Sequence, residues 1–491
     1  MRNYTLSAKI VLVQLVCILS ATQTLYSQNA VMYGMTQNGG ADSVGAIIAY
    51  NLTTGTESVV YSFGRDSDGQ IPSGSLVYCP LNGLLYGLTA GGGKYGNGAV
   101  ISFNPANNTE AVAWNLGHAS NGPASPYGDL VYDANNHLFY AMTFGGGDNA
   151  IGCVFSFNPA IDSIKQLWNF GYNGGANLPY GNLVLNPNNG LYYGMTSQGG
   201  NNNDGAIITL NPLTDTVHRV YNFNDGQSGE TPNGSLVWSS TTNLFYGMTS
   251  AGGADSLGTL FSFNPADSVE TTLHNFGFGT DAAGPLANLI YNENTGLFYG
   301  LSINGGEGNG QGTIFSFNPA NDSVTVLHSF GNVTNDGEFP NGSLIYDAAD
   351  NLYYGLTQGG GTNHTGTIFS FNPSNNAETT LWSLGSGTDG AGPQGSLLLL
   401  NNGFPAAINN LKHSYNINLY PNPGNGNFLL QSQNATGATY NVYNINGELI
   451  SAGTIQSDLQ NINLIHAADG MYIMKIDGKE GTVPVRFAVI K

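Results

Sequence analysis

The sequence has little charge, and most of that charge is negative. Of its 491 residues only 9% are charged, with 11 Lys and Arg against 31 Asp and Glu and a formal net charge of −20. A protein that binds nucleic acid needs a basic surface to displace the counterions of the phosphates, so nucleic acid is excluded as a partner. An anionic membrane surface is excluded for the same reason.

Long hydrophobic runs are also missing. The longest apolar stretch, Ile10–Leu19, is too short to cross a bilayer. It follows Arg2 and Lys9 and precedes small and polar residues, which is the pattern of a secretory signal peptide over residues 1–27, cut near Ser27. No other run reaches about 18 residues, so we expect no transmembrane segment in the mature chain.

Cysteine is scarce. Cys17 lies in the leader, where the bulky Val16 before it argues against a lipid-modified cysteine. Cys79 and Cys153 remain in the mature chain, and no Cys-x-x-Cys or Cys/His cluster predicts a structural zinc site. Because the two cysteines occupy non-equivalent positions of the repeat described below, we favour two buried thiols over the disulfide that export would permit.

Glycine, with 70 residues, and aromatic residues, with 11%, are abundant and fall into an internal repeat of about 53 residues. The string Tyr-Gly-Met-Thr and its variants recurs at intervals of 53 to 55 residues, with its tyrosine at positions 33, 86, 140, 193, 246, 299 and 354. Three other strings keep the same step: Ser-Leu-Val-Tyr, Phe-Ser-Phe-Asn-Pro and Trp-Asn-Phe-Gly, with their variants. All four are rich in β-branched and aromatic residues and are bounded by Gly, Asn, Asp and Pro, which indicates strands and turns.

Four strands in each of seven units predict an all-β fold, a seven-bladed β-propeller over residues 28–400. Each four-stranded blade has two apolar faces that only neighbouring blades can cover. The repeat begins at a second strand, residues 31–36, and ends at a lone first strand, residues 396–400. We therefore expect the ring to close with three N-terminal strands and one C-terminal strand in one sheet.

The repeat is similar to kelch-like propellers, because Leu85-Tyr-Gly-Leu-Thr-Ala-Gly-Gly92 stands where kelch repeats have a strand followed by a Gly-Gly pair. It more closely resembles the bacterial secreted tandem repeats called GloVer, in units such as Gly342–Thr357 followed by a glycine triplet and Gly366-Thr-Ile-Phe369. The resemblance covers residues 29–400. It implies the propeller fold and no particular ligand.

The repeat stops after residue 400, and residues 401–415 predict a linker. Residues 416–491 alternate strands with turn signals, which predicts a small β-sandwich. This module resembles the type A C-terminal sorting domain of type IX secretion. The matching positions are Tyr420, Pro421, Asn422, Pro423, the Asn446-Gly447 turn, Gly470, Tyr472, Lys475 and Lys491.

The resemblance to the sorting domain implies a fate for the protein. It implies export through the periplasm of a Gram-negative bacterium and recognition by the type IX secretion machinery. It also implies removal of the module and release, or attachment to surface polysaccharide. A carbohydrate-binding or adhesion sandwich is the alternative interpretation of residues 416–491.

Loop lengths indicate where a ligand would bind. The second-to-third and fourth-to-first connections are the long ones and should emerge on one face, which we expect to be the binding face. The residue that begins each inner strand is Ser, Asp or Asn and should line the channel mouth. These residues are Ser75, Asp129, Asn182, Ser235, Asn288, Ser343 and Ser396.

Aromatic residues lie close to this ring in the sequence. Tyr127 and Tyr180 stand two positions before the ring in adjacent units, and loops of the same sector add Tyr95, Phe144 and Tyr172. Exposed aromatic rings beside Asp129 and Asn182 suit a sugar, whose apolar face stacks on a ring while its hydroxyls meet polar groups. Packing between blades is the alternative role for these tyrosines.

Two further rings of polar residues are interpreted as structural. Asp or Asn in the crossing loops should cap turns, and a clustered Asp-x-Asp-x-Asp calcium loop is absent from the sequence. Hydroxyl groups at the ends of the second strands should bond to neighbouring backbone. They are Thr36, Thr89, Thr143, Thr196, Thr249, Ser302 and Thr357.

We therefore expect an exported cell-surface or extracellular protein that recognises glycan or protein through its long-loop face, as a monomer and without a cofactor. No His pairs with a Ser or a carboxylate in a recognisable motif, and no pair of acids breaks the repeat as a glycosidase pair would. No catalytic residue and no metal ligand is predicted. A secreted glycan-degrading enzyme and a purely structural surface protein remain the alternatives.

Overall fold

The computed structural model describes residues 30–64, 68–119, 121–171, 175–224, 228–401, 404–405, 416–420, 426–433, 435–444, 449–457, 459–468, 470–478 and 481–489. The regular elements in these ranges are strands, and none of the described residues forms a helix long and apolar enough to span a membrane. The chain divides into two compact units between Ala406 and Ala407. The predicted signal peptide lies outside the described residues.

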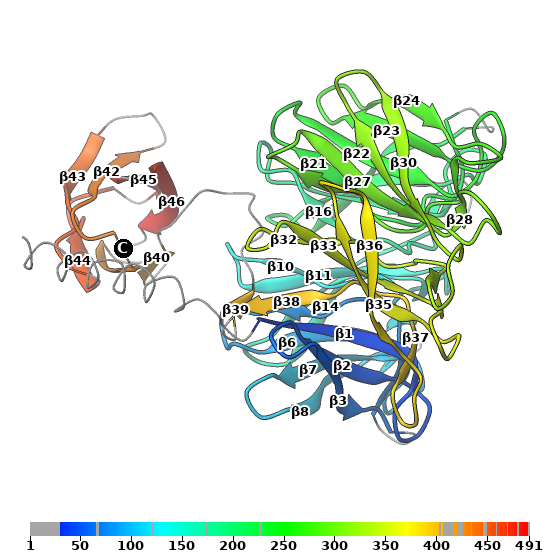
Figure 1. Ribbon diagram of the computed structural model, residues 1–491. Coiled ribbons are helices and arrows are strands. Elements are labelled where there is room, and N and C mark those ends of the chain that lie inside the picture. Colours follow the sequence, from blue (N-terminus) through cyan, green and yellow to red (C-terminus); the bar gives the residue numbers. More distant parts are fainter. Residues whose placement is uncertain are drawn as a thin grey trace, which may run out of the picture. The chain divides into compact units, whose positions relative to one another are not determined.

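The first unit is built of seven antiparallel sheets, each with four main strands ordered from the innermost to the outermost (Figure 1). The innermost strands are β5 (Val77–Tyr78), β10 (Val131–Asp133), β16 (Val184–Leu185), β21 (Val237–Ser239), β26 (Ile290–Asn292), β32 (Ile345–Asp347) and β38 (Leu398–Asn401). The second strands are β1 (Ala30–Gly39), β6 (Leu85–Gly92), β11 (Leu138–Thr143), β17 (Tyr192–Thr196), β22 (Leu244–Thr249), β27 (Leu297–Ser302) and β33 (Leu352–Thr357).

The outer half of each sheet has a third strand of six residues and a fourth strand of seven. The third strands are β2 (Ala46–Asn51), β7 (Ala99–Asn104), β13 (Cys153–Asn158), β19 (Ala206–Asn211), β23 (Thr259–Asn264), β29 (Thr313–Asn318) and β35 (Thr367–Asn372). The fourth strands are β3 (Thr56–Ser62), β8 (Thr109–Asn115), β14 (Ser163–Asn169), β20 (Thr216–Asn222), β24 (Val269–Asn275), β30 (Ser323–Ser329) and β36 (Ala377–Ser383). This all-β arrangement is the β-propeller fold that the repeat predicts.

One sheet combines strands from both ends of the unit. In this sheet β38 pairs with β1, with Leu400 opposite Val31 and Leu398 opposite Tyr33. The two-residue strand β39 (Phe404–Pro405) then pairs with β38. The first residues of the segment expected to be a linker therefore extend this sheet.

Aromatic contacts between neighbouring sheets explain why the repeat forms a ring. The tyrosine ring of the repeated string packs against an aromatic ring of the next sheet. The ring centres are 5.1 Å apart in Tyr86–Phe139, 4.6 Å in Tyr193–Phe245 and 4.4 Å in Tyr246–Phe298. These tyrosines are almost fully buried. Because every sheet buries its faces against its neighbours, the apolar core of the propeller is distributed among the blades.

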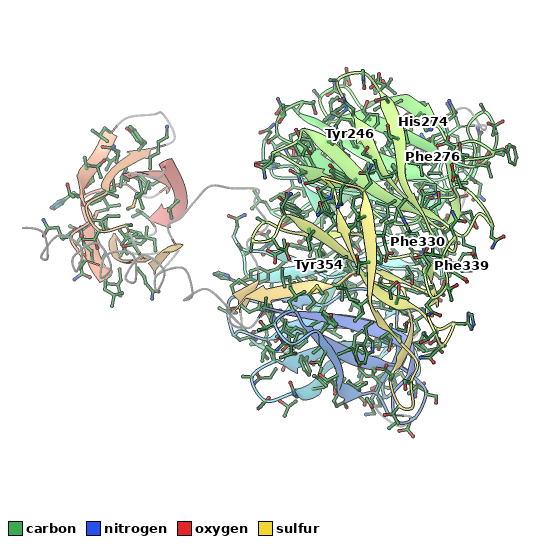
Figure 2. The ribbon with its side chains drawn as sticks, viewed as in Figure 1. Tyr246, His274, Phe276, Phe330, Phe339 and Tyr354 are labelled. Carbon is green, nitrogen blue, oxygen red and sulfur yellow. The ribbon has the colours of Figure 1, made fainter. Side chains whose placement is uncertain are left out.

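A second set of aromatic contacts lies on the outermost strands. In four units the ring side chain at the sixth position of the fourth strand packs edge-on against the Phe two residues later. The pairs are Tyr61–Phe63, Tyr221–Phe223, His328–Phe330 and, on β24, His274–Phe276 (Figure 2). The same position holds a tyrosine at Tyr61 and a tryptophan at Trp382. It therefore accepts several kinds of planar side chain.

The crossing loops contact the next blade through short strands. The pairs are β4 (Gly69–Pro72) with β6, β9 (Pro123–Ala124) with β12 (Gly145–Gly146), β15 (Ala176–Asn177) with β18 (Gln198–Gly199), β25 (Ala282–Ala283) with β28 (Asn304–Gly305), β31 (Gly337–Glu338) with β34 (Gly359–Gly360), and β37 (Gly390–Pro393) with β1. A bridge between Glu230 and Ala251 completes the set. The two kinds of long connection therefore lie together on one face, as expected.

The ring of hydroxyl groups below these loops is structural, as predicted. Each member is fully buried and donates a hydrogen bond of 2.7–3.1 Å to the backbone carbonyl two residues later. The pattern holds at all seven positions, from Thr36 to Thr357. The hydroxyl residue is the last residue of five second strands and lies three residues before the end of β1 and β6.

The second unit contains two antiparallel sheets. One has the strand order β40 (Asn416–Tyr420), β41 (Asn427–Gln433), β44 (Leu459–Asn463), and the other has the order β43 (Leu449–Thr454), β42 (Thr439–Asn444), β45 (Gly470–Gly478), β46 (Gly481–Val489). A single hydrophobic cluster joins them, with Phe428 and Leu430 from the first sheet and Val442 and Met474 from the second. This is the small sandwich that the sequence predicts.

Candidate functional site

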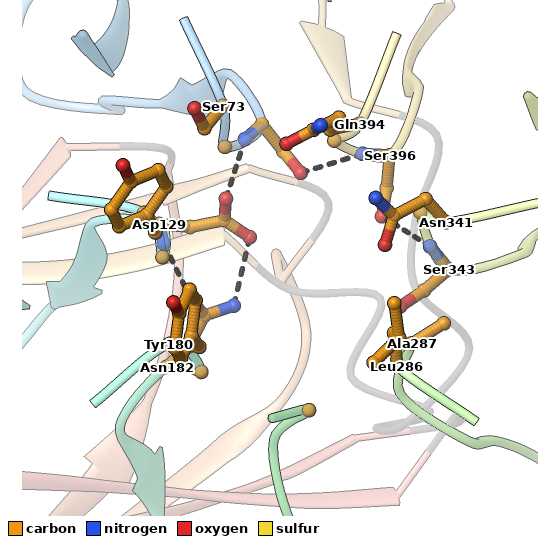
Figure 3. Close-up of a pocket in the computed structure, with 18 of the residues that line it drawn as sticks. Ser73, Asp129, Tyr180, Asn182, Leu286, Ala287, Asn341, Ser343, Gln394 and Ser396 are labelled. Atoms are coloured by element: carbon orange, nitrogen blue, oxygen red, sulfur yellow. Dashed lines mark hydrogen bonds between the residues drawn. The ribbon is translucent and has the colours of Figure 1, made fainter. Parts of the chain in front are cut away.

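A closed ring of hydrogen bonds lies where the seven innermost strands begin. Each unit contributes the short polar residue of a three-residue segment, and its side-chain oxygen accepts the backbone N–H of the corresponding residue in the preceding unit. The donors and acceptors are Ser75 to Asp129, Asp129 to Asn182, Asn182 to Ser235, Ser235 to Asn288, Asn288 to Ser343, Ser343 to Ser396, and Ser396 to Ser75. We call this set the central ring; Figure 3 shows part of it.

The central ring returns to its starting residue after seven steps, and its last bond joins residues 321 positions apart in the chain. The sequence predicts these residues at the channel mouth, but it does not predict the hydrogen bonds between them. The signal was the restriction of the position to Ser, Asp and Asn, the short side chains whose oxygen can reach a neighbouring backbone N–H. The ring therefore has a structural role as well as a place at the site.

Glycine precedes the ring residue in six of the seven units because the strands converge tightly there. A Cβ atom at Gly181 would overlap the carbonyl oxygen of Gly234, and one at Gly342 would overlap that of Gly395. Ala287 is the exception. The backbones of neighbouring units therefore approach one another too closely for a larger side chain at most of these positions.

A cavity of about 640 Å³ lies above the central ring. Its wall is made chiefly by the residues two positions before the ring. They are Ser73, Tyr127, Tyr180, Asn233, Leu286, Asn341 and Gln394. Among the described residues that line the cavity none is basic, and Asp129 supplies the single carboxyl group.

One side of the cavity is aromatic. The rings of Tyr127 and Tyr180 are 5.3 Å apart, and Phe144 packs against both, at 5.4 and 5.0 Å. Tyr180 is 37% exposed, so it offers a face to solvent although it also packs against its neighbours. Burial raises the pKa of the Tyr180 hydroxyl, and the neighbouring Tyr127 adds to the shift, so the hydroxyl stays protonated at neutral pH.

The structure does not bring all the predicted aromatic residues together. Tyr95 is absent from the described lining of the cavity, and its ring lies 5.4 Å from His118 and close to the Lys94 ammonium. Its backbone carbonyl also accepts a hydrogen bond from Asn97. The expectation that Tyr95 joins the other aromatics was therefore wrong, because its loop directs it to a different neighbour. Tyr172 lies outside the described residues.

Another part of the cavity wall is polar. The amide nitrogen Nε2 of Gln37 donates to Ser73 Oγ at 2.9 Å and to Gln394 Oε1 at 2.7 Å, and so connects two units across the closing sheet. Sequence reasoning missed Gln37, because it lies after the hydroxyl residue of β1 rather than before an inner strand. Ser73 and Gln394 line the cavity with a hydroxyl and an amide group (Figure 3).

Asp129 lies between two neighbouring units on the cavity floor. Its Oδ1 accepts the backbone N–H of Ser75, and its Oδ2 accepts the side-chain amide of Asn182 at 2.8 Å. Burial raises the pKa of the carboxyl group, and the hydrogen bonds from Ser75 and Asn182 oppose that shift. Asp129, Asn182, Ser75 and Ser235 therefore line the cavity as predicted, with part of their hydrogen-bonding capacity already used by the ring.

The crossing-loop aspartates have the turn role that was predicted for them. Asp68, Asp281 and Asp336 each accept a backbone N–H from a glycine four or five residues earlier, at 2.9–3.0 Å. Asp389 accepts the N–H of the next residue instead, at 3.2 Å. Cys79 and Cys153 are buried and unbridged, in agreement with the expectation of two thiols.

The predicted sorting motif is partly visible in the second unit. Tyr420 ends β40 and Gly470 begins β45. Tyr472 is buried and donates its hydroxyl to the carbonyl of Ala468 at 2.7 Å, whereas Lys475 is exposed with its ammonium 5.6 Å from the centre of the Tyr443 ring. Pro421, Asn422, Pro423, the turn at 446–447 and Lys491 lie outside the described residues.

Comparison with known proteins gives two family matches and several structural neighbours. Residues 20–245 and 188–419 match the Gloeobacter/Verrucomicrobia repeat, and residues 418–491 match the secretion system C-terminal sorting domain. No curated protein matches the chain.

Among solved structures, a Bacteroides fragilis protein provisionally described as a 6-phosphogluconolactonase is 14% identical, with 77% of this chain and 99% of that chain covered and a TM-score of 0.51. A Bacteroides uniformis protein of the same description is 13% identical over 76% of this chain and 99% of that chain, with a TM-score of 0.49. PorZ, an essential surface component of the type-IX secretion system of Porphyromonas gingivalis, is 14% identical over 91% of this chain and 63% of that chain, with a TM-score of 0.43.

At these identities the structural likeness shows the fold and no activity. The sorting domain indicates delivery by type IX secretion to the cell surface or the extracellular space. The repeat model covers most of the remaining sequence. The chain therefore belongs to the Gloeobacter/Verrucomicrobia repeat family, with a secretion sorting domain at its C-terminal end.

Proposed function

We propose that this exported protein binds a neutral glycan in the cavity above the central ring. The observation that carries the proposal is the division of the cavity wall into an aromatic side at Tyr127 and Tyr180 and an amide and hydroxyl side at Gln394, Ser73 and Asn341. A sugar ring has an apolar face and a rim of hydroxyl groups, so it complements both sides at once.

The charge of the lining supports a neutral ligand over an anionic one. Its described residues include one acidic group and no basic group, so a phosphate or sulfate would find no counter-charge there. The cavity volume of about 640 Å³ lies within the range of about 300–1,000 Å³ that small-ligand sites have. The Oγ atom of Ser235 accepts one backbone N–H, and its hydroxyl proton can be donated to a ligand, whereas the Ser75 hydroxyl already bonds to Asp129.

The test is glycan-array screening of the full chain followed by calorimetric titration of the best neutral oligosaccharide. In the variant carrying Tyr127→Leu and Tyr180→Leu, both rings are replaced by the residue that stands at the equivalent position 286. Each aromatic contact contributes about 0.5–1.5 kcal/mol, so the double variant should bind roughly 5- to 150-fold more weakly.

Tyr95→Leu is the matched control, because Tyr95 is as exposed as Tyr180 but does not line the cavity. It should bind with the affinity of the wild type. An array without any signal, or equal affinity in the double variant, contradicts the proposal. Release of reducing sugar from the bound oligosaccharide would favour the glycan-degrading alternative.

A further inference from the structure

Three interfaces between neighbouring blades contain the same kind of side-chain cluster. Each combines the planar residue at the sixth position of a fourth strand, the aspartate of the crossing loop that follows, and the glutamate at the second position of the next fourth strand. The clusters are Tyr61 with Asp68 and Glu110, Trp382 with Asp389 and Glu57, and His328 with Asp336 and Glu378.

In the first two clusters the planar residue donates a hydrogen bond. The hydroxyl of Tyr61 donates to Asp68 Oδ2 at 2.7 Å, and the indole N–H of Trp382 donates to Asp389 Oδ2 at 3.3 Å. Burial, with the neighbouring aspartate adding to it, raises the pKa of Glu110 to about 8 and that of Glu57 to about 9. Glu110 and Glu57 therefore each carry a proton at neutral pH.

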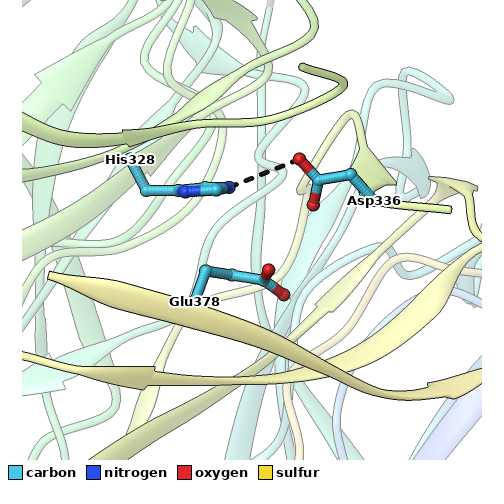
Figure 4. A group of neighbouring side chains, drawn as sticks. All are labelled: His328, Asp336 and Glu378. Atoms are coloured by element: carbon cyan, nitrogen blue, oxygen red, sulfur yellow. Dashed lines mark ion pairs between the residues drawn. The ribbon is translucent and has the colours of Figure 1, made fainter. Parts of the chain in front are cut away.

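The third cluster differs in chemistry, because an imidazole replaces the phenol or indole (Figure 4). The Nε2 atom of His328 lies 3.5 Å from Asp336 Oδ2, which is long for a hydrogen bond. Neither His328 Nε2 nor Glu378 Oε1 has a hydrogen-bond partner among the described residues, although both atoms are buried. The Oε1 atoms of Glu57 and Glu110 are likewise unpartnered, so the buried imidazole nitrogen is what distinguishes this cluster. Two buried polar atoms that face one another without partners need an explanation.

The remaining group of the cluster is held rigidly. The side chain of Asp336 is fully buried, its Oδ1 accepts the N–H of Gly337 at 2.8 Å, and its Oδ2 accepts the N–H of Gly331 at 3.0 Å. Such backbone bonds orient a carboxylate for a further ligand. One ligand atom from each of His328, Asp336 and Glu378 lies within 4.8 Å of the other two.

We propose that His328, Asp336 and Glu378 bind one Zn²⁺ ion between the blades that contain β30 and β36. An imidazole nitrogen and two carboxylate oxygens are a ligand set that Zn²⁺ accepts, with water as the fourth ligand. Tetrahedral bonds of about 2.0–2.1 Å place ligand atoms roughly 3.4 Å apart, close to the observed 3.5 Å between His328 and Asp336. Ca²⁺, which takes six to eight oxygen ligands, fits this set poorly.

The neighbouring interface shows what the same position looks like without a third ligand. There His274 Nε2 lies 3.0 Å from Asp281 Oδ2, an ordinary hydrogen bond, and the glutamate position is occupied by Val324. Burial would raise the pKa of Asp281, but the contact with His274 outweighs it and lowers that pKa. The pair is complete by itself, whereas the cluster at His328 is not.

The test measures zinc binding by the full chain without a histidine tag. Metal analysis after equilibration with ZnCl₂ and dialysis should find one zinc per chain, and calorimetric titration should give its affinity. His328→Tyr and Glu378→Val should each lose at least tenfold in affinity. Both changes introduce residues that other blades carry at the same positions, namely Tyr61 and Val324, so the fold should tolerate them.

His274→Tyr is the matched control and should bind zinc as the wild type does. Circular dichroism checks that each variant is folded. If either His328→Tyr or Glu378→Val misfolds, the zinc affinity of the other variant tests the proposal. Absence of zinc binding, equal affinity in the folded variants, or equal loss in His274→Tyr overturns the proposal. Binding of CaCl₂ in place of ZnCl₂ overturns it as well.

Discussion

The central ring can be tested at the bond that closes it. Replacing Ser75 by Ala removes the oxygen that accepts the backbone N–H of Ser396 at 2.8 Å. Ser75 is only 8% exposed and Ser396 is half-buried, so the freed N–H of Ser396 has limited access to water. A buried donor without a partner costs about 1–3 kcal/mol, and we expect the free energy of unfolding of the propeller to fall by that amount.

The expected change in melting temperature is small but measurable. Unfolding entropy of about 2.1 cal/mol/K per residue amounts to roughly 0.8 kcal/mol/K for a unit of this size, so the melting temperature should drop by about 1–4 °C. Urea denaturation followed by circular dichroism gives an independent value from the shift in midpoint. Scanning calorimetry on the same samples checks that the propeller unfolds in one transition.

Ser75→Asn supplies the control, because Asn182 and Asn288 occupy the same position in other units and their Oδ1 atoms accept the ring bond. This variant should keep most of the wild-type stability. If Ser75→Ala is as stable as the wild type, or if Ser75→Asn is as unstable as Ser75→Ala, the hydrogen bonds of the central ring do not contribute to the free energy of unfolding.

Further predictions concern packing, pH and redox state. Gly342→Ala should destabilise the propeller by several kcal/mol in urea denaturation, since the new methyl group meets a carbonyl oxygen, whereas Gly171→Ala, with open space around it, should not. Glu57, with a pKa of about 9 in the folded state, binds a proton that the unfolded chain releases near pH 4.5. Stability should therefore decline as pH rises from about 5 to 9, and Glu57→Gln should flatten this dependence in denaturation midpoints. Reducing agent should leave the melting temperature unchanged, because both described cysteines are unbridged; a shift would show that they pair in solution.

Much of the fold could be predicted because the same four strand sequences recur in seven units. The interval of about 53 residues places a tyrosine in every interface, and the positions of the strands follow from strings that recur with it. The pairing of β1 with β38 followed from a repeat that begins at a second strand and ends at a first. Periodicity works here because each blade must bury the same two faces.

The site was predictable only in part, because departures from the repeat depend on the course of individual loops. Tyr127 and Tyr180 meet because they occupy equivalent positions in adjacent blades, so their contact could be inferred. Tyr95 lies in a loop whose direction is set by contacts with its own neighbours, and the sequence does not show them. Gln37 follows the hydroxyl residue of its strand, a position whose residue type differs between units, so the repeat does not reveal its bonds to Ser73 and Gln394.

The cluster at His328 could not be predicted because its members come from three different repeat positions and two blades. A signal was nevertheless present. The sixth position of the fourth strand is Tyr or Trp in five units and His in two, and only one of those histidines is followed by a blade with glutamate at its second position. Comparing the same position across all units would have isolated it.

The pairing of β1 with β38 also means that the closing sheet cannot be completed early in synthesis. Because β38 begins more than 350 residues after β1 ends, this sheet gains its innermost strand only when nearly the whole unit has been synthesised. If a protease removed the sorting domain, the position of the cut would matter for the same reason. A cut before Leu398 would remove β38 and leave β1 without this partner, whereas a cut after Pro405 would leave β38 and β39 in the sheet.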